Sequence, residues 1–319
     1  MGLKYKAARR AVWFINGVVD TAVLIIILLF VVVGCFAIWD SKQIYQAADA
    51  KHYEVYKPTD EKGELSFKEL QAINPDVFSW LTVYGTHIDY PVVQGEDNMK
   101  YINTNAEGRY SLSGAIFMDF HCSKDFSDFS SILYGHHMDK DTMFGEIGDF
   151  SDISYFSARK YGSLYYGGRE HGLEFFAFLH ADAYDDTIYR TNIIGKEART
   201  AYLSALLSKS MHTRDIKVTA DDRIILLSTC SASSTNGRDI LVGRITDKVF
   251  DDHFKTGIAD GGAPAAIGLK SLLSRLPVWV WMVIITLLLA LPIWLLAMLL
   301  NDRKRYHNRR GDETPFQRR

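Results

Sequence analysis

The chain has 319 residues, of which 48% are hydrophobic, and its formal net charge is −2. This near-neutral balance gives no reason to expect nucleic acid as a partner. Three cysteines, Cys35, Cys122 and Cys230, are too few and too scattered for a disulfide framework. The length allows one or two domains.

The first element is an apolar run at residues 18–39, preceded by a basic segment at 1–17. As a helix the run would be about 33 Å long, enough to cross a bilayer. A cleaved signal peptide is the alternative, but no A-x-A-like site directly follows the run. Cys35 follows Val-Val-Gly, as in a lipoprotein processing box, but the run continues to Trp39. The pattern therefore favours an uncleaved membrane helix.

A second apolar run without charges covers residues 277–300, and a basic tail follows at 301–319. It would be about 35 Å long as a helix, and Pro292 within it is tolerated in a membrane. Positive flanks stay in the cytoplasm. We therefore predict a cell-membrane protein with two spans, both termini cytoplasmic, and the intervening loop outside the cell.

The loop begins with residues 40–72, whose spaced apolar positions predict a helical lead-in broken near Pro58 and Gly63. Short segments rich in β-branched and aromatic residues then predict strands. A helix with one apolar face is expected at Lys196–Lys209, and 256–276 reads as a Gly- and Ala-rich linker. The predicted strands are Trp80–Tyr84, His87–Val93, Gly114–Met118, Ser130–Tyr134, Leu173–Ala183, Arg223–Thr229 and Asp239–Thr246.

These elements predict a mostly β fold. Many short strands with few helices favour a closed β-barrel of about eight strands. It would carry N-terminal helices and one inserted helix, between two transmembrane helices.

The sharpest local feature is an apolar strand at 223–229 that ends in a lone cysteine, Cys230. A polar turn at 231–237 follows, and Arg238 opens the next apolar strand. If the strands pair as a hairpin, Cys230 and Arg238 lie at the same end of the sheet. A guanidinium there would favour a thiolate and stabilise charge on a carbonyl under attack.

A nucleophilic cysteine needs a histidine brought near by the fold. His136 and His137 follow Gly135 directly after a predicted strand, at a place where scaffolds present reactive groups. Purely structural explanations remain open. A cysteine at a strand end is often a small buried hydrophobic residue, and a His-His pair often lies in a solvated loop. A zinc site of His136, His137 and Cys230 would lack a fourth ligand and the usual spacing, so no metal is predicted.

Over residues 73–254 the sequence resembles the sortase family, and within it class B. Leu227-Ser228-Thr229-Cys230 is similar to the family's active-site strand, and Tyr134-Gly135-His136-His137-Met138 to the class B histidine segment. Arg238 stands where the family has an arginine on the following strand. The block Ile88-Asp89-Tyr90-Pro91-Val92-Val93-Gln94-Gly95 also resembles class B. His136, Cys230 and Arg238 therefore occur in the same order along the chain as the histidine, cysteine and arginine of the family.

The resemblance implies that residues 73–255 form an extracellular catalytic domain with a transpeptidase mechanism. Cys230 would attack a backbone carbonyl within a sorting motif near the C-terminus of a secreted protein. His136 would protonate the leaving amine, and Arg238 would hold the motif and the oxyanion. An amine would then resolve the thioacyl enzyme, either from a lipid-linked cell-wall precursor or from a pilin lysine. No metal or organic cofactor is implied.

Three further residues, Ser228, Thr229 and Ser231, are expected to bind the motif, although ordinary hydrogen bonding within a turn explains them nearly as well. Arg244 competes with Arg238, but on an extended strand it would lie about 20 Å beyond it. Two alternative functions remain at this point: a cysteine peptidase that only hydrolyses, and a surface module without chemistry.

The second span departs from the family pattern, because class B sortases that anchor single proteins commonly have only the N-terminal span. A C-terminal span is more familiar in sortases that polymerise pilins, so the biological task stays open. The second span also resembles the end of a sorting signal. However, Leu276-Pro277-Val278-Trp279-Val280 lacks the threonine and glycine of such a motif. The chain therefore resembles the enzyme and not its substrate.

Overall fold

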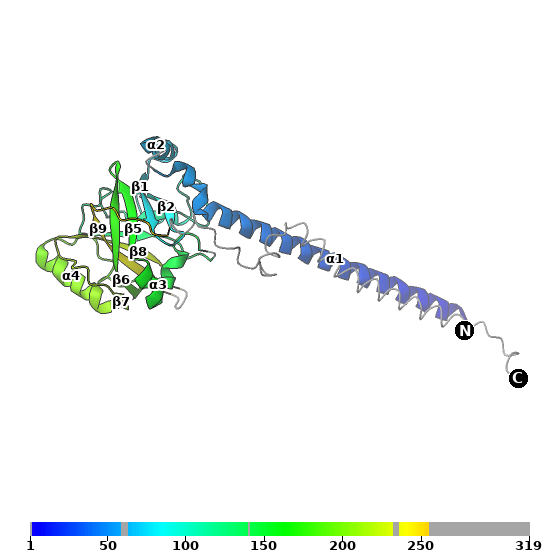
Figure 1. Cartoon of the computed structure of the whole chain (residues 1–319). Coiled ribbons are helices and arrows are strands. Elements are labelled where there is room, and N and C mark those ends of the chain that lie inside the picture. Colours follow the sequence, from blue (N-terminus) through cyan, green and yellow to red (C-terminus); the bar gives the residue numbers. More distant parts are fainter. Residues whose placement is uncertain (1, 59–62, 140, 232–235, 255–319) are drawn as a thin grey trace. The chain divides into compact units, whose positions relative to one another are not determined.

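The computed structural model describes residues 2–58, 63–139, 141–231 and 236–254 (Figure 1). The predicted linker at 256–276, the second predicted membrane helix at 277–300 and the basic tail at 301–319 lie outside these residues. The chain divides into two units, and the larger of them, Asp40–Gly261, contains every strand that the structure describes.

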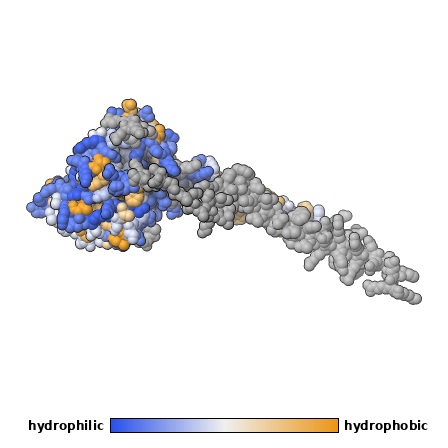
Figure 2. Space-filling model, viewed as in Figure 1, coloured by the Kyte–Doolittle hydropathy of each residue, from blue (hydrophilic) through white to orange (hydrophobic). Residues whose placement is uncertain are grey.

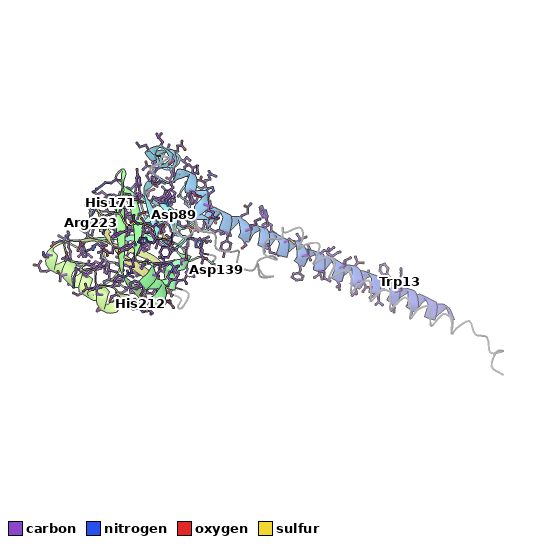
Figure 3. The ribbon with its side chains drawn as sticks, viewed as in Figure 1. Trp13, Asp89, Asp139, His171, His212 and Arg223 are labelled. Carbon is purple, nitrogen blue, oxygen red and sulfur yellow. The ribbon has the colours of Figure 1, made fainter. Side chains whose placement is uncertain are left out.

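The N-terminal helix α1 (Gly2–Ala48) contains the first predicted membrane helix. Within the described residues it alone is long and apolar enough to cross a membrane, over Val12–Tyr45, where an 18-residue window has a mean hydropathy of 3.2. Its apolar side chains are exposed, as Trp13 (Figure 3) illustrates with an exposed fraction of 74%. Phe30 is 73% exposed. Helices of this length and composition occur both as membrane anchors and as signal sequences.

Short helices lead from α1 to the first strand. They are the 3₁₀ turns η1 (Ala50–His52) and η2 (Glu54–Tyr56) and the helix α2 (Gly63–Ile73). The Asp49 carboxylate accepts a hydrogen bond of 3.0 Å from the Lys51 N–H and so begins η1. The helical part of residues 40–48 belongs to α1 and is not a separate element.

Eight strands close into a barrel in the order β5-β1-β2-β3-β4-β8-β9-β6, and the pairing of β5 with β6 completes the ring. A two-residue ninth strand, β7, pairs with β6. The strands are β1 (Val77–Val83), β2 (Asp89–Val93), β3 (Ile116–Met118), β4 (Ser130–Tyr134), β5 (Tyr161–Tyr166), β6 (Arg169–Asp182), β7 (His212–Thr213), β8 (Arg223–Cys230) and β9 (Gly237–Thr246).

The remaining helices lie between strands. They are η3 (Lys100–Ile102), η4 (Gly145–Ser151), α3 (Ile153–Ala158) and α4 (Lys196–Lys209). The closed, mostly β barrel and the inserted helix α4 are therefore confirmed. The sequence prediction missed β5, β7, η3, η4 and α3, which are short.

The apolar residues form two layers, one on each side of the strands. On β8, alternate residues such as Ile225 and Leu227 pack into the barrel interior, whereas Ile224 and Leu226 pack on the outer face. That outer cluster also contains Tyr202 of α4. Figure 2 shows a mostly hydrophilic surface on the visible face of this unit. Strand β8 is thus buried on both faces and holds its terminal residues firmly.

Candidate active site

Cys230 and Arg238 face each other across an antiparallel strand pair. Cys230 is the last residue of β8, and in the register of β8 and β9 it lies opposite Arg238. The Arg238 Nη1 donates a hydrogen bond of 3.2 Å to the Cys230 Sγ. The cysteine is exposed, so a reactant can reach the sulfur. The hairpin predicted from the sequence brings the two side chains together.

His136 reaches the same edge of the barrel from a neighbouring strand. Strand β4 runs parallel to β8, with Tyr134 opposite Ser228, and the Gly135 N–H donates to the Ser228 carbonyl oxygen at 3.2 Å. Continuing that register brings His136 level with Cys230. The His136 Nε2 lies 2.8 Å from the Ile102 carbonyl oxygen. Because a carbonyl oxygen only accepts, Nε2 carries a proton in this contact.

Gly135 is needed where the chain leaves β4. A Cβ at this position would lie 2.5 Å from the Ile116 Cδ1 and 2.7 Å from the Phe144 Cδ2. No real Cβ approaches other atoms so closely, so a larger residue would push the backbone away. The glycine therefore lets the chain pass between these side chains and deliver His136 to the edge of the barrel.

One pocket of about 570 Å³ contains all three residues predicted to be catalytic, Cys230, His136 and Arg238. Such a volume is typical of a binding site. Aromatic and apolar side chains supply much of its wall. The remaining lining residues are Asn98, Met99, Ile102, Phe117, Tyr134, Gly135, Ala183, Tyr184, Tyr189, Ser228 and Thr229.

The three residues expected to bind a motif have different positions. Ser228 lies in the pocket wall, and its hydroxyl is 2.8 Å from the Tyr189 hydroxyl. Thr229 also lines the pocket, but its hydroxyl is buried and has no hydrogen-bond partner within the described residues. Ser231 is not in the pocket lining, and its N–H donates to the Gly237 carbonyl oxygen at 2.8 Å. Their role in binding stays a prediction.

Arg244, the competing arginine, lies elsewhere. It is opposite Ile224 in the β8–β9 register, far from Cys230 along the strand. Its Nη2 donates to the Glu174 Oε2 at 2.6 Å. Arg244 therefore joins β9 to β6 and does not reach the pocket.

Sequence reasoning missed Tyr184 and Tyr189, which line the pocket beside Tyr134. Tyr189 follows β6 in a loop and stacks on Tyr134, with 6.3 Å between ring centroids. Burial raises the pKa of Tyr189 to about 12, so its phenol stays protonated at neutral pH. No spacing in the sequence points to Tyr189, because only the folded chain brings that loop to β8.

His137, a ligand in the zinc alternative, forms an isolated backbone bridge with Met143. Across the part of the chain that the structure describes, no group of three or more His, Cys, Asp and Glu side chains is placed to hold a metal.

Comparison with known proteins identifies the family. No family model matches the chain. Sortase B of Staphylococcus aureus is 32% identical over 206 residues, which cover 64% of this chain and 81% of that protein. Sortase B of Listeria monocytogenes is 30% identical over 212 residues, which cover 65% of this chain and 86% of that protein.

Among solved structures, sortase B from the type II pilus of Streptococcus pneumoniae is 48% identical with a TM-score of 0.51, covering 57% of this chain and 99% of that one. A class B sortase of Streptococcus pyogenes involved in pilus biogenesis is 41% identical with a TM-score of 0.51, covering 56% of this chain and 97% of that one. The chain therefore belongs to the class B sortases and is a cysteine transpeptidase.

Proposed function

We propose that this protein cleaves a sorting motif near the C-terminus of secreted proteins and transfers the new acyl group to an amine, with Cys230 as the nucleophile. The observation that carries the proposal is the hydrogen bond of 3.2 Å from the Arg238 Nη1 to the exposed Cys230 Sγ. A guanidinium next to sulfur stabilises negative charge on it, and the thiolate is the nucleophilic form of cysteine.

The first half of the reaction would acylate the enzyme. The Cys230 thiolate forms a bond to the carbonyl carbon of the scissile peptide, and the carbonyl oxygen takes the negative charge. The Arg238 guanidinium, which shares the pocket, is available to stabilise that oxyanion. When the tetrahedral intermediate collapses, the C–N bond breaks and His136 gives a proton to the leaving amine. A thioester on Cys230 remains.

The second half would transfer the acyl group. An incoming amine attacks the thioester carbon and loses a proton to His136, and the sulfur leaves as a thiolate. Cys230 is then a thiolate again, and His136 again carries the proton that it gives to the next leaving amine. The reaction balances without a metal or an organic cofactor.

The acceptor amine is either a lipid-linked cell-wall precursor or a lysine of another surface protein. The 48% identical protein is a sortase B from a type II pilus, and the 41% identical one is a class B sortase involved in pilus biogenesis. That similarity favours a pilin-type lysine as the acceptor here.

We further propose that the catalytic unit lies outside the cell. The exposed apolar surface of α1 and the basic residues in its first turns support an anchor with a cytoplasmic N-terminus. The apolar run at 277–300 and the basic tail would return the C-terminus to the cytoplasm. Protease added to intact cells should then digest the loop between the runs but spare tags on both termini.

The test of the chemistry uses the full chain in lipid nanodiscs, mixed with a panel of sorting-motif peptides. Each peptide is tried alone, with an oligoglycine amine and with a lysine-containing peptide, and products are identified by mass. A transpeptidase gives an amide product whose yield rises with the amine. If cleavage gives only the free acid at every amine concentration, the hydrolytic alternative holds instead.

A further inference from the structure

The loop that follows His136 is held in an uncommon backbone conformation. This histidine loop, residues 136–139 and 141–144, folds back on itself through a bridge between His137 and Met143 and a hydrogen bond of 3.1 Å from the Phe144 N–H to the His136 carbonyl oxygen. Asp141 and Met143 have φ angles of 57° and 54°, in the left-handed region that side chains other than glycine rarely adopt. Such a loop keeps its shape only where surrounding groups restrain it.

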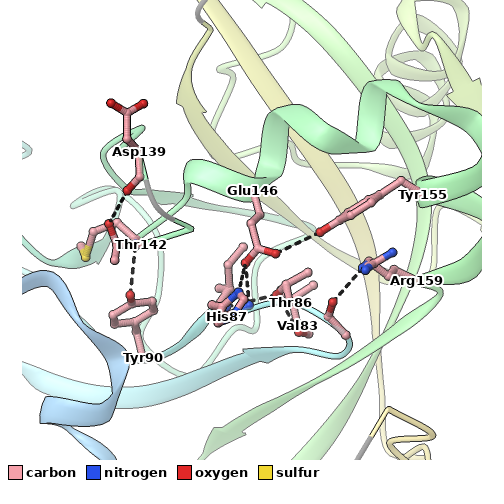
Figure 4. A network of polar contacts seen from close by, with 12 residues as sticks. Val83, Thr86, His87, Tyr90, Asp139, Thr142, Glu146, Tyr155 and Arg159 are labelled. Atoms are coloured by element: carbon pink, nitrogen blue, oxygen red, sulfur yellow. Dashed lines mark hydrogen bonds and ion pairs between the residues drawn. The ribbon is translucent and has the colours of Figure 1, made fainter. Parts of the chain in front are cut away.

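Tyr90 of β2 supplies a restraint at the far side of this loop. Its hydroxyl accepts a hydrogen bond of 2.9 Å from the Met143 N–H and donates one of 2.8 Å to the Ala48 carbonyl oxygen. Figure 4 shows the Tyr90 ring beneath the loop, with its hydroxyl directed at the backbone next to Thr142. Ala48 is the last residue of α1. One buried hydroxyl thus joins the end of the N-terminal helix to the loop that carries His136.

The hydroxyl is well suited to this double role. Tyr90 is 2% exposed, so water does not compete for either hydrogen bond. Burial raises the pKa of Tyr90 far above its usual range, and the phenol keeps the proton that it donates to Ala48. Both the donor and an acceptor lone pair of the hydroxyl are used.

Other contacts hold the two ends of the histidine loop. On its N-terminal side, the Gly135 N–H is bonded to Ser228. Beyond its C-terminal side, the Glu146 carboxylate accepts hydrogen bonds from the His87 N–H at 2.5 Å and from the Tyr155 hydroxyl at 3.1 Å (Figure 4). Loss of the Tyr90 hydroxyl would therefore loosen the loop between fixed ends without unfolding the barrel.

We propose that Tyr90 is a positioning residue for His136: its hydroxyl joins the final carbonyl of α1 to the backbone of the histidine loop and so fixes the histidine relative to Cys230. This inference rests on the proposed role of His136 as the proton donor. A misplacement of about 1 Å in a reacting group can cost up to about a hundredfold in rate. The Ala48 end of α1, which belongs to the same unit as the barrel, then contributes to the catalytic geometry.

The test compares Tyr90→Phe with the wild-type full chain in nanodiscs. Tyr166→Phe is the matched control, because Tyr166 is also buried and its hydroxyl accepts a hydrogen bond of 3.0 Å from the Arg223 Nη1 at the opposite end of β8. Acylation by an active sorting-motif peptide is followed by intact mass at increasing peptide concentrations. Hydrogen exchange at the Met143 and Phe144 amides is measured on the same samples.

We expect Tyr90→Phe to lower the acylation rate at saturating peptide by about tenfold while the half-saturating peptide concentration stays unchanged. Hydrogen exchange at the Met143 and Phe144 amides should become at least about tenfold faster. The Met143 N–H loses its acceptor, and Phe144 follows a residue that is no longer held in place. Tyr166→Phe should change neither quantity.

Unchanged acylation or unchanged exchange in Tyr90→Phe would overturn the inference. So would an effect confined to the half-saturating peptide concentration, or faster exchange throughout the barrel, which would mark a merely structural role. If no peptide acylates the wild-type protein, the proposed function fails by itself. The exchange rates of Tyr90→Phe then decide alone whether the hydroxyl holds the loop.

Discussion

Arg238 lies directly opposite Cys230 across the β8–β9 pair, and its Nη1 is 3.2 Å from the Cys230 Sγ. The strand ladder sets this spacing, because β8 and β9 are paired along their whole length from Arg223 to Cys230. Each of these strands is paired on both sides, β8 with β4 and β9, and β9 with β8 and β6, and most of their residues are buried. The two groups are therefore preorganised before any peptide binds, which is the condition for electrostatic stabilisation of a transition state.

Replacement of Arg238 by alanine should slow acylation of Cys230 by about 100-fold or more, the cost of removing one oxyanion donor. The fold should be unaffected because Arg238 is not a core residue. Intact-mass kinetics measure the rate, and thermal unfolding measures the fold.

Arg244→Ala is the matched control for that variant. It leaves the half-buried Glu174 without its partner, so we expect a loss of roughly 2 kcal/mol in the free energy of unfolding. Acylation by the folded fraction should stay at the wild-type rate. A large loss of acylation in Arg244→Ala with none in Arg238→Ala would reverse the assignment.

The two adjacent histidines should behave differently. His136→Ala should lower acylation by about 100- to 10,000-fold, because general acid catalysis of amine departure is lost. His137→Ala should stay within about tenfold of the wild type, since the bridge between His137 and Met143 is made by backbone atoms. Equal losses in both variants would contradict the assignment of His136.

Gly135→Ala should destabilise the barrel. Its new methyl group would meet Ile116 and Phe144 at distances no side chain tolerates, and overpacking of this kind costs about 1–3 kcal/mol. Acylation should fall as well, because His136 follows directly. Gly34→Ala in α1 is the control, since nothing lies within 4 Å of the added carbon. If Gly135→Ala unfolds at the same temperature as the wild type, the end of β4 accommodates the added methyl group and the prediction is wrong.

Cys122 and Cys230 should differ in their reaction with iodoacetamide. Burial raises the pKa of Cys122 to about 12, so its thiol stays neutral and unreactive between pH 7 and roughly pH 10 in the folded protein. Because an unfolded thiol ionises near pH 8.5, this burial contributes stability below that pH, and the contribution declines as the pH rises toward 12.

Peptide mapping after alkylation at several pH values measures the difference. We expect modification of Cys230 with Cys122 untouched until the protein is denatured, and Cys122→Ala should acylate normally. Labelling of Cys122 at the rate of Cys230 in folded protein would contradict the burial.

The pattern of the chain predicts the features that depend on neighbouring residues. The Cys230–Arg238 hairpin and the helix at Lys196–Lys209 follow from local periodicity and turn chemistry. Strand β5 was missed because it is short and begins Tyr161-Gly162-Ser163, although its pairing with β6 closes the barrel. Closure requires β5 to pair with β1 as well as with β6, and β1 is distant from β5 in the sequence, so no local sequence pattern predicts it.

The same reason explains which site residues were found. Cys230, His136 and Arg238 stand at strand ends that hydrophobic runs make visible. Tyr189 and Tyr90 carry no such mark, because their partners are distant in sequence and meet them only after folding. Alternation along β8 does separate Thr229 from Ser228 and Cys230, so the sequence could have assigned these residues to different faces.

The central claim is that Cys230 forms a thioester with a peptide and passes the acyl group to an amine. The most direct measurement is the intact mass of the full chain during reaction with an active peptide, followed by mapping of the adduct, in the wild type and in Cys230→Ala. We predict an adduct on Cys230 that disappears as an added amine gains the acyl group, and no adduct in a folded Cys230→Ala protein. Adduct or amide product from Cys230→Ala would contradict the account.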